Sequence, residues 1–147
     1  MSVRPILLVE DNLADIELTL AALKRSQVLN EIVVARDGVQ ALDYIFGEGQ
    51  YADQQPERPA VVLLDLKLPK IDGMEVLQRV KAHPEHRNIP IVMLTSSREE
   101  GDVLRSYQGG VNSFVVKPVE FNAFFEAIHH LGMVWAVLNE PFPSGRN

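Results

Sequence analysis

The sequence predicts an α/β domain in which helices cover both faces of a five-stranded parallel β-sheet. Short apolar runs alternate five times with stretches whose apolar residues recur at helical spacing. Runs without regular polar alternation are typical of strands buried on both faces of a parallel sheet. The 147 residues are enough for one domain with a substantial core.

The first two strand–helix units occupy the N-terminal part of the chain. An apolar run at residues 6–9 predicts the first strand, and Asn12 is a suitable cap for the helix that follows. The apolar positions of this helix are Leu13, Ile16, Leu20 and Leu23. Asn30 is expected to end the helix, and residues 31–35 predict the second strand. The apolar positions of the next helix are Val39, Leu42, Ile45 and Phe46.

The third unit follows a long polar segment. Residues 47–59 are rich in turn formers and predict a surface loop, which either contacts a partner or is simply tolerated. Residues 61–65 predict the third strand, and a loop that ends at Asp72-Gly73 leads into the third helix. The apolar positions of that helix are Met74, Leu77 and Val80, and Pro84 stops it.

The last two units complete the domain. Residues 89–94 and 113–116 predict the fourth and fifth strands. Apolar positions of a short helix between them are Val103, Leu104 and Tyr107. Those of the last helix are Phe121, Phe124, Phe125, Ile128 and Leu131, and the pattern can extend to Leu138. We therefore expect a domain at residues 1–131, with residues 132–147 as an extension of the last helix and a tail for interactions.

Composition excludes several classes of function. The net charge of −6, with no cluster of Lys and Arg, argues against nucleic acid as a direct partner. The absence of cysteine excludes disulfides, thiol catalysis and thiolate metal sites. No apolar run is long enough to span a bilayer, and the N-terminus lacks the layout of a signal peptide. We expect a cytoplasmic protein without a membrane partner.

Polar side chains follow four of the predicted strands at the point where each strand ends. They are Glu10-Asp11, Asp65, Thr95 and Lys117. Because the carboxyl ends of parallel strands meet at one edge of a sheet, these groups should converge. Each residue alone has an ordinary structural explanation, such as a helix cap or a solvated lysine. Their common position at strand ends indicates a functional site instead.

The chemistry of this set points to phosphoryl transfer. Three neighbouring carboxylates repel one another, and this repulsion raises at least one pKa unless a cation intervenes. Oxygen ligands without His or Cys favour Mg²⁺. We expect Asp65 to act as the nucleophile, Mg²⁺ and Lys117 to neutralise the phosphoryl oxygens, and Thr95 to donate a hydrogen bond to one of them.

Four stretches of the sequence resemble the receiver domain of two-component response regulators, the CheY-like family. They are Val9-Glu10-Asp11-Asn12, Leu64 to Pro69 with Asp72-Gly73, Leu94-Thr95-Ser96, and Val116-Lys117-Pro118. The resemblance covers roughly Pro5 to Leu131. It implies a flavodoxin-like, doubly wound sheet with the strand order 2-1-3-4-5.

The resemblance also implies how the site residues act. Asp65 would accept a phosphoryl group from a histidine kinase. Asp11 would bind Mg²⁺ directly, Glu10 would assist through water, and the backbone carbonyl of Lys67 would complete the protein ligands. Lys117 would pair with the phosphoryl oxygens.

The switch would consist of Thr95, which moves toward the phosphoryl group, and the aromatic residue Phe114, which turns inward as Thr95 moves. Because Phe114 lacks the hydroxyl of a tyrosine, its ring cannot contribute a hydrogen bond to the switch.

The expected partners rest on a narrower resemblance. No DNA-binding domain follows, so we expect a single-domain regulator. The long loop before the third strand, the Ser106-Tyr107 pair and the aromatic, proline-ended tail resemble regulators paired with phytochrome-type histidine kinases. This implies a bilin-bearing kinase as the phosphodonor and a homodimer through the last helix and tail. The tail residues suited to association are Trp135, Val137, Leu138 and Phe142. Alternatively, the tail folds back on its own domain.

Other classes of function fit less well. A Mg²⁺-dependent phosphatase with an aspartyl nucleophile usually has a general acid two residues later, where this chain has Lys67. A dinucleotide enzyme would need a Gly-rich turn after the first strand. A dimerising adaptor that acts without phosphorylation has no need of the acidic set. We expect a signalling switch that modifies only itself, rather than an enzyme with external substrates.

Overall fold

The computed structural model describes residues 4–25, 28–106 and 113–130. Its strands are β1 (Ile6–Val9), β2 (Ile32–Ala35), β3 (Val61–Asp65), β4 (Ile91–Thr95) and β5 (Ser113–Val116). Its helices are α1 (Leu13–Arg25), α2 (Gly38–Phe46), the short 3₁₀ helix η1 (Gly49–Tyr51), α3 (Gly73–Ala82), α4 (Arg98–Ser106) and α5 (Phe121–His130). All strand pairs are parallel, and the order β2-β1-β3-β4-β5 confirms the prediction.

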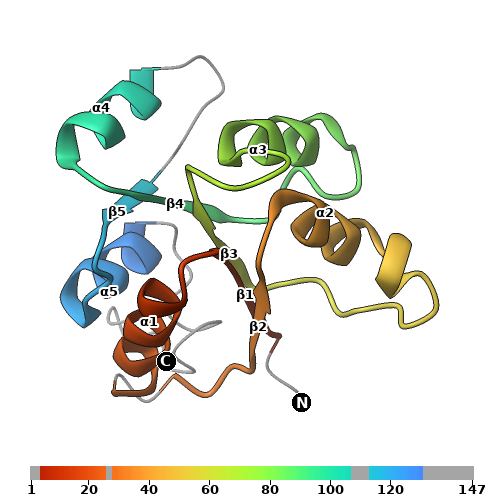
Figure 1. Ribbon diagram of the computed structural model, residues 1–147, viewed down its shortest axis with the longest axis horizontal. Coiled ribbons are helices and arrows are strands. Elements are labelled where there is room, and N and C mark those ends of the chain that lie inside the picture. The colour runs from red at the N-terminus through yellow and green to blue at the C-terminus, as the bar shows by residue number, and fades with distance from the viewer. Residues whose placement is uncertain (1–3, 26–27, 107–112, 131–147) are drawn as a thin grey trace, which may run out of the picture.

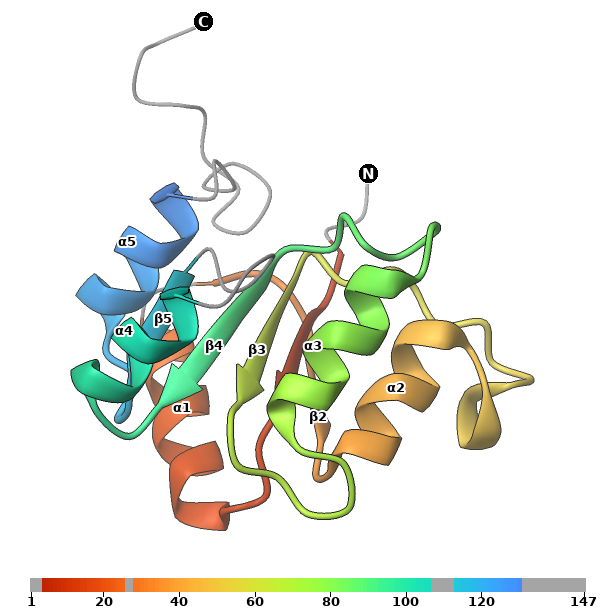
Figure 2. The same ribbon diagram turned by 90° about the horizontal axis from the view of Figure 1, so that it is seen from above.

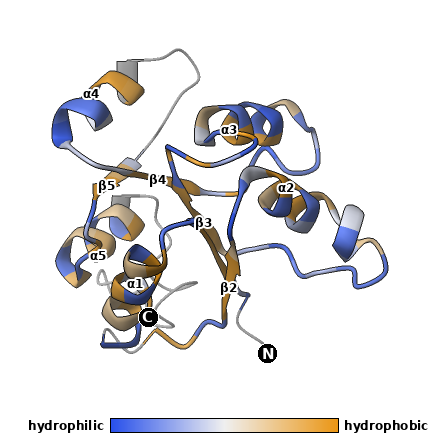
Figure 3. Cartoon of the chain, viewed as in Figure 1, coloured by the Kyte–Doolittle hydropathy of each residue, from blue (hydrophilic) through white to orange (hydrophobic). Residues whose placement is uncertain are grey.

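The sheet lies between two layers of helices. Helices α1 and α5 cover one face, while α2, α3 and α4 cover the other (Figures 1 and 2). Because crossovers between parallel strands are right-handed, the change of direction in the strand order at β2 places helices on both faces. Figure 3 shows the apolar strands running between helices whose outer surfaces are more polar.

Each inner strand contributes side chains to both halves of the core. In β1, Leu7 and Val9 pack with α2 and α3, whereas Ile6 and Leu8 pack with α1 and α5. All four side chains are fully buried. The alternation follows the two-residue period of a strand and explains why a strand buried on both faces has no polar position.

Two strand starts differ from the prediction. The fourth strand begins at Ile91 rather than at residue 89, because Pro90 has no N–H to contribute to the ladder. The carbonyl of Pro90 nevertheless accepts a hydrogen bond from the Val62 amide (2.9 Å). The second strand begins at Ile32, one residue later than predicted.

Four apolar residues assigned to helix cores are exposed, and for these the prediction was wrong. Leu13 is 62% exposed, and Val39, Val103 and Phe121 are also exposed. Leu13 opens α1 directly after the β1–α1 loop, so its turn lies at the carboxyl edge of the sheet rather than over the strands. Helical spacing does not reveal where a helix extends past the sheet it covers.

The polar segment before β3 is partly tied to its own domain. It contains η1, whose Tyr51 contacts Tyr44 of α2 edge to face, with ring centroids 5.1 Å apart. Tyr51 also packs against the core. At least this part of the predicted surface loop has an internal packing role.

The predicted extension of the last helix and the tail, including Leu131 and the four apolar residues from Trp135 to Phe142, lies outside the described residues. Tyr107 lies there too. Among the described residues, no helix has the length and apolarity needed to cross a membrane.

Candidate functional site

The four strand ends meet at one edge of the sheet, as predicted. Carboxylate oxygens of Glu10, Asp11 and Asp65 all lie within 4.8 Å of one another. Asp65 is the last residue of β3 and pairs in register with Leu94 of β4. Glu10 and Asp65 are buried, while Asp11 is more exposed.

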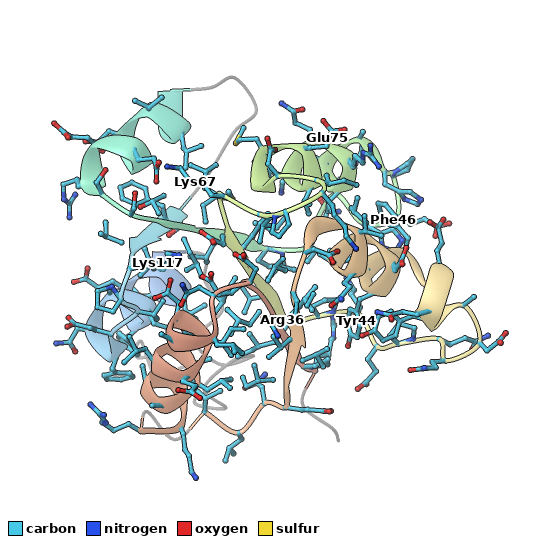
Figure 4. All side chains as sticks on the ribbon, viewed as in Figure 1. Arg36, Tyr44, Phe46, Lys67, Glu75 and Lys117 are labelled. Carbon is cyan, nitrogen blue, oxygen red and sulfur yellow. The ribbon has the colours of Figure 1, made fainter. Side chains whose placement is uncertain are left out.

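Lys117 supplies the positive charge at this edge. Its Nζ lies 3.1 Å from Glu10 Oε1, 3.0 Å from Asp15 Oδ2 and 3.3 Å from Asp65 Oδ1. The Lys117 amide donates to the Thr95 carbonyl (2.8 Å), which fixes the chain just after β5. The peptide bond between Lys117 and Pro118 is cis. Figure 4 shows Lys117 close to the ends of β5 and α1.

Burial and charge perturb both sides of this pairing. Burial first, and then the negative charge of Glu10, raises the pKa of Asp65 to about 6, although Lys117 opposes the shift. Burial alone would lower the pKa of Lys117, but hydrogen bonds to Asp15 and Glu10 and the charge of Asp65 raise it above its usual range. Lys117 therefore stays protonated. A second cation beside Asp65 would offset the negative charge of Glu10, which is one cause of the raised pKa of Asp65.

The three carboxylates fit a hard divalent cation. Every donor atom is an oxygen, and neither His nor Cys belongs to the cluster that the described residues form. Burial and the charge of Glu10 together raise the pKa of Asp65 despite the nearby ammonium of Lys117. Proteins typically hold Mg²⁺ by one or two carboxylates while the ion keeps several waters, and this cluster offers enough carboxylates for such a site.

An open cleft leads to Asp11 and gives access to the site. It has a volume of about 500 Å³, and its walls are Asp11, Leu66, Lys67, Leu68, Pro69 and Asp72. Gly73 starts α3 so close to β3 that a Cβ there would collide with the backbone of Asp65 and Leu66. This close approach is the physical reason for a glycine after Asp72, whose carboxylate caps α3 by accepting from the Glu75 amide (2.9 Å).

The predicted switch residues lie on the two strands that follow β3 in the sheet, Thr95 at the end of β4 and Phe114 on β5. Thr95 is buried, and its hydroxyl donates to the carbonyl oxygen of Ser97 (3.0 Å). Phe114 is half-buried on β5, and its ring packs so closely on Gly101 of α4 that no Cβ fits between them. Thr95 thus connects the end of β4 to the loop before α4, and Phe114 connects β5 to α4 itself.

The side chain of Lys67 turns away from the carboxylates. Its Nζ lies 3.8 Å from Glu100 Oε2, and the side chain is 80% exposed (Figure 4). Glu100 also accepts from the amide (3.0 Å) and hydroxyl (3.2 Å) of Ser96. Glu100 therefore links the loop after β3 to the loop after β4.

Sequence reasoning missed three polar contributors. Asp15 binds Lys117, Arg36 donates from Nη2 to the Asp11 carbonyl (3.0 Å), and Glu100 holds Ser96. Asp15 could have been found, because it lies four residues after Asp11 in the first turn of a predicted helix. Arg36 and Glu100 carry no comparable signal, since their contacts depend on how separate loops approach one another.

Comparison with known proteins identifies the kind of domain to which this geometry corresponds. The family model described as the response regulator receiver domain matches residues 6–129. The response regulator Rcp1 of Synechocystis sp. (strain ATCC 27184 / PCC 6803 / Kazusa) is 39% identical over 130 residues, which cover 88% of this chain and 87% of Rcp1.

Solved structures agree with this match. The bacteriophytochrome response regulator AtBRR is 64% identical, with a TM-score of 0.89, and the alignment covers 95% of this chain and 100% of AtBRR. A Mn²⁺-bound form of Rcp1 is 37% identical, with a TM-score of 0.71 and coverage of 95% and 99%. The phosphorylated cyanobacterial phytochrome response regulator RcpA is 40% identical, with a TM-score of 0.72 and coverage of 97% and 99%.

Proposed function

Because the chain belongs to the response regulator receiver domain family, we propose that it is a phosphorylation-activated switch with Asp65 as the phosphoacceptor. The observation that carries the proposal is the position of Lys117, 3.3 Å from Asp65 inside a cluster of acidic side chains at one sheet edge. The phosphorylated state of RcpA and the Mn²⁺-bound state of Rcp1 support the same chemistry in relatives.

The residues can be given roles in the transfer. An Asp65 carboxylate oxygen attacks the phosphorus of a phosphohistidine, the P–N bond breaks, and the imidazole nitrogen keeps the electron pair. Lys117 stays protonated and offsets charge on the phosphoryl oxygens. Glu10, Asp11, Asp65 and the Lys67 carbonyl would hold Mg²⁺, which would neutralise further phosphoryl charge.

Release of Thr95 from Ser97 would convert this chemical event into a conformational one. The Thr95 hydroxyl can then donate to a phosphoryl oxygen, and the loop after β4 loses one of its local hydrogen bonds. Phe114 and α4 lie next to this loop, so they are the elements whose populations a phosphoryl group would bias.

A direct test uses acetyl phosphate and Mg²⁺ with intact-mass measurement. The protein should gain one phosphoryl group, and Asp65→Asn should gain none. Asp53→Asn, which changes an exposed aspartate in the loop after η1, is the matched control and should be phosphorylated like the wild type. Equal phosphorylation of the Asp65→Asn variant would refute the assignment of the acceptor.

The phosphodonor is proposed to be a histidine kinase of the bilin-binding phytochrome type. AtBRR and RcpA support this, because they are a bacteriophytochrome and a cyanobacterial phytochrome response regulator, respectively. Phosphotransfer from a purified bacteriophytochrome kinase should exceed transfer from an unrelated histidine kinase. Equal rates from both kinases would count against a phytochrome partner.

A phosphatase with external substrates remains the weaker candidate. The position two residues after Asp65 is Lys67, whose side chain is exposed and paired with Glu100. It does not offer the general acid that such an enzyme needs. We propose instead a switch whose phosphoryl chemistry is confined to itself.

We also propose a homodimer through the last helix and tail. The described part of α5 reaches His130, and the apolar residues expected to associate follow it in the sequence. Analytical ultracentrifugation of the whole chain and of a version truncated after His130 tests this. A dimer for the first and a monomer for the second is expected, whereas two monomers would end the proposal.

A further inference from the structure

The ammonium of Lys117 is shared among three carboxylates rather than reserved for Asp65. The distances to Asp15, Glu10 and Asp65 are 3.0, 3.1 and 3.3 Å. Lys117 Nζ donates hydrogen bonds to Glu10 Oε1 and Asp15 Oδ2, whereas Asp65 lies at ion-pair distance from it. In this state Lys117 is held at least as closely by its neighbours as by the proposed acceptor.

The three carboxylates are not equivalent. Glu10 and Asp65 are buried and belong to the cluster that fits a divalent cation. Asp15 lies outside that cluster, on the first turn of α1, and its side chain is 29% exposed. Its charge therefore bears on the site through Lys117 and not through metal binding.

Local structure explains why Asp15 can stay at this position. Its amide donates to the side chain of Asn12 (2.9 Å), which caps the start of α1. A negative charge in the first turn also suits the helix dipole. These contacts stabilise α1, but they do not require a carboxylate that reaches across to the residue after β5.

We infer that Asp15 is a positioning residue for phosphoryl transfer, which draws Lys117 toward α1 and thereby limits the positive charge available to a phosphoryl group at Asp65. This rests on the proposed function of Asp65. While Asp15 is charged, the Lys117 ammonium is attracted toward α1 as well as toward Asp65, so less of its positive charge is available to a phosphoryl group at Asp65. With Asp15 neutral, Glu10, whose Oε1 lies 3.1 Å from Lys117 Nζ, would still hold the ammonium near Asp65.

The substitution Asp15→Asn isolates this charge, because asparagine keeps the size and one acceptor oxygen. We expect the second-order rate of phosphorylation by acetyl phosphate, with Mg²⁺ present, to rise about threefold to fivefold, in keeping with one partly exposed charge pair. The affinity for beryllofluoride, a phosphoryl mimic that can be followed by fluorine NMR, should rise by a similar factor. Asp15→Glu restores the charge and should return both values toward those of the wild type.

Two controls separate this role from a merely structural one. Glu17→Gln removes the same charge from an exposed position of α1 and should leave both values unchanged. In a Lys117→Gln background, Asp15→Asn should have no effect on beryllofluoride affinity, because the ammonium through which Asp15 is proposed to act is absent.

The outcomes distinguish the two proposals. A wild-type protein that accepts no phosphoryl group would overturn the proposed function. A wild type that accepts it, with Asp15→Asn equal to or slower than wild type, would overturn only the role of Asp15. So would an Asp15→Asn effect that persists without Lys117.

Discussion

The acidic edge at β1 and β3 and the neighbouring region of Phe114 and α4 are held together by different means. The acidic edge rests on two strands that are buried along their whole length, and its charges interlock through Lys117. In the Phe114 region, β5 is an edge strand with alternating burial. The loop before α4 is held by short-range bonds such as the one from Thr95 to Ser97.

This difference suits a switch. Chemistry at Asp65 requires carboxylates and an ammonium fixed to within a fraction of an ångström, which a fully buried pair of strands provides. A responsive element requires bonds that can be exchanged at small cost, and local side-chain to backbone bonds contribute only about 1 kcal/mol each. Substitutions in the acidic edge should therefore change stability and chemistry strongly, and substitutions in the Phe114 region should act more weakly.

The largest effect is expected for Lys117→Met. Without the ammonium, the buried carboxylates of Glu10 and Asp65 lose their only cation among the described residues. Removing one partner of such a pair should lower the free energy of unfolding by about 2–4 kcal/mol near neutral pH in metal-free buffer. Urea denaturation would measure it.

The matched control for that variant is Lys67→Met, on the loop after β3. Its ion pair with Glu100 is 3.8 Å long and largely exposed, so the free energy of unfolding should change by less than about 0.5 kcal/mol. Equal losses for the two lysine variants would contradict the view that the acidic edge is the interlocked part.

A smaller effect is expected from the titration of Asp65 itself. Its pKa rises on folding from 3.8 to about 6, so folding favours the protonated acid. The stabilisation is fully present below pH 3.8 and is lost as the pH rises through about 6. Because asparagine cannot ionise, Asp65→Asn avoids burying a charged carboxylate and should stabilise the metal-free protein near neutral pH by about 1–2 kcal/mol.

Adding Mg²⁺ should reverse the order of the two proteins. A cation that binds the carboxylates stabilises the wild type by an amount that grows with its concentration, whereas the asparagine variant lacks one of the three carboxylates. Thermal unfolding across this pH range, with and without Mg²⁺, would show this. Parallel pH curves for wild type and variant would show that the pKa of Asp65 is not raised.

The sequence was sufficient to predict the acidic edge, and the reason is geometric. Strand polarity in a parallel sheet places residues such as Glu10, Asp65 and Lys117 at one edge regardless of the details of packing. The strand order was obtained from resemblance instead, because alternation of strands and helices leaves several orders open.

The contacts between loops could not be predicted in the same way. The pairing of Asp15 with Lys117 and the bond from Thr95 to Ser97 depend on side-chain rotamers and on the distance between elements. Leu13 shows the same limit, since its spacing matches the buried stripe while its place at the sheet edge leaves it exposed. The spacing of apolar residues predicts which of them share one face of a helix, but it does not predict whether that face packs on the sheet or is exposed to solvent.

The smallest effect, and the sharpest test of the Phe114 region, is expected for Gly101→Ala. Alanine favours a helix over glycine by about 1 kcal/mol. Here, however, the new Cβ would collide with the Phe114 ring, and overpacking costs about 1–3 kcal/mol. We expect a net loss of about 1 kcal/mol or less in the free energy of unfolding, because the ring is only half-buried and can shift.

Whether Gly101→Ala lowers or raises the free energy of unfolding should depend on the residue at position 114. In a Phe114→Ala protein the collision is gone, so Gly101→Ala should stabilise by about 1 kcal/mol through helix propensity alone. Urea denaturation of the four proteins gives the coupling between the two positions. The same change in both backgrounds would mean that Phe114 does not constrain α4. A change of sign would mean that the ring and the helix are energetically coupled, as expected if a shift of Phe114 is to be felt by α4.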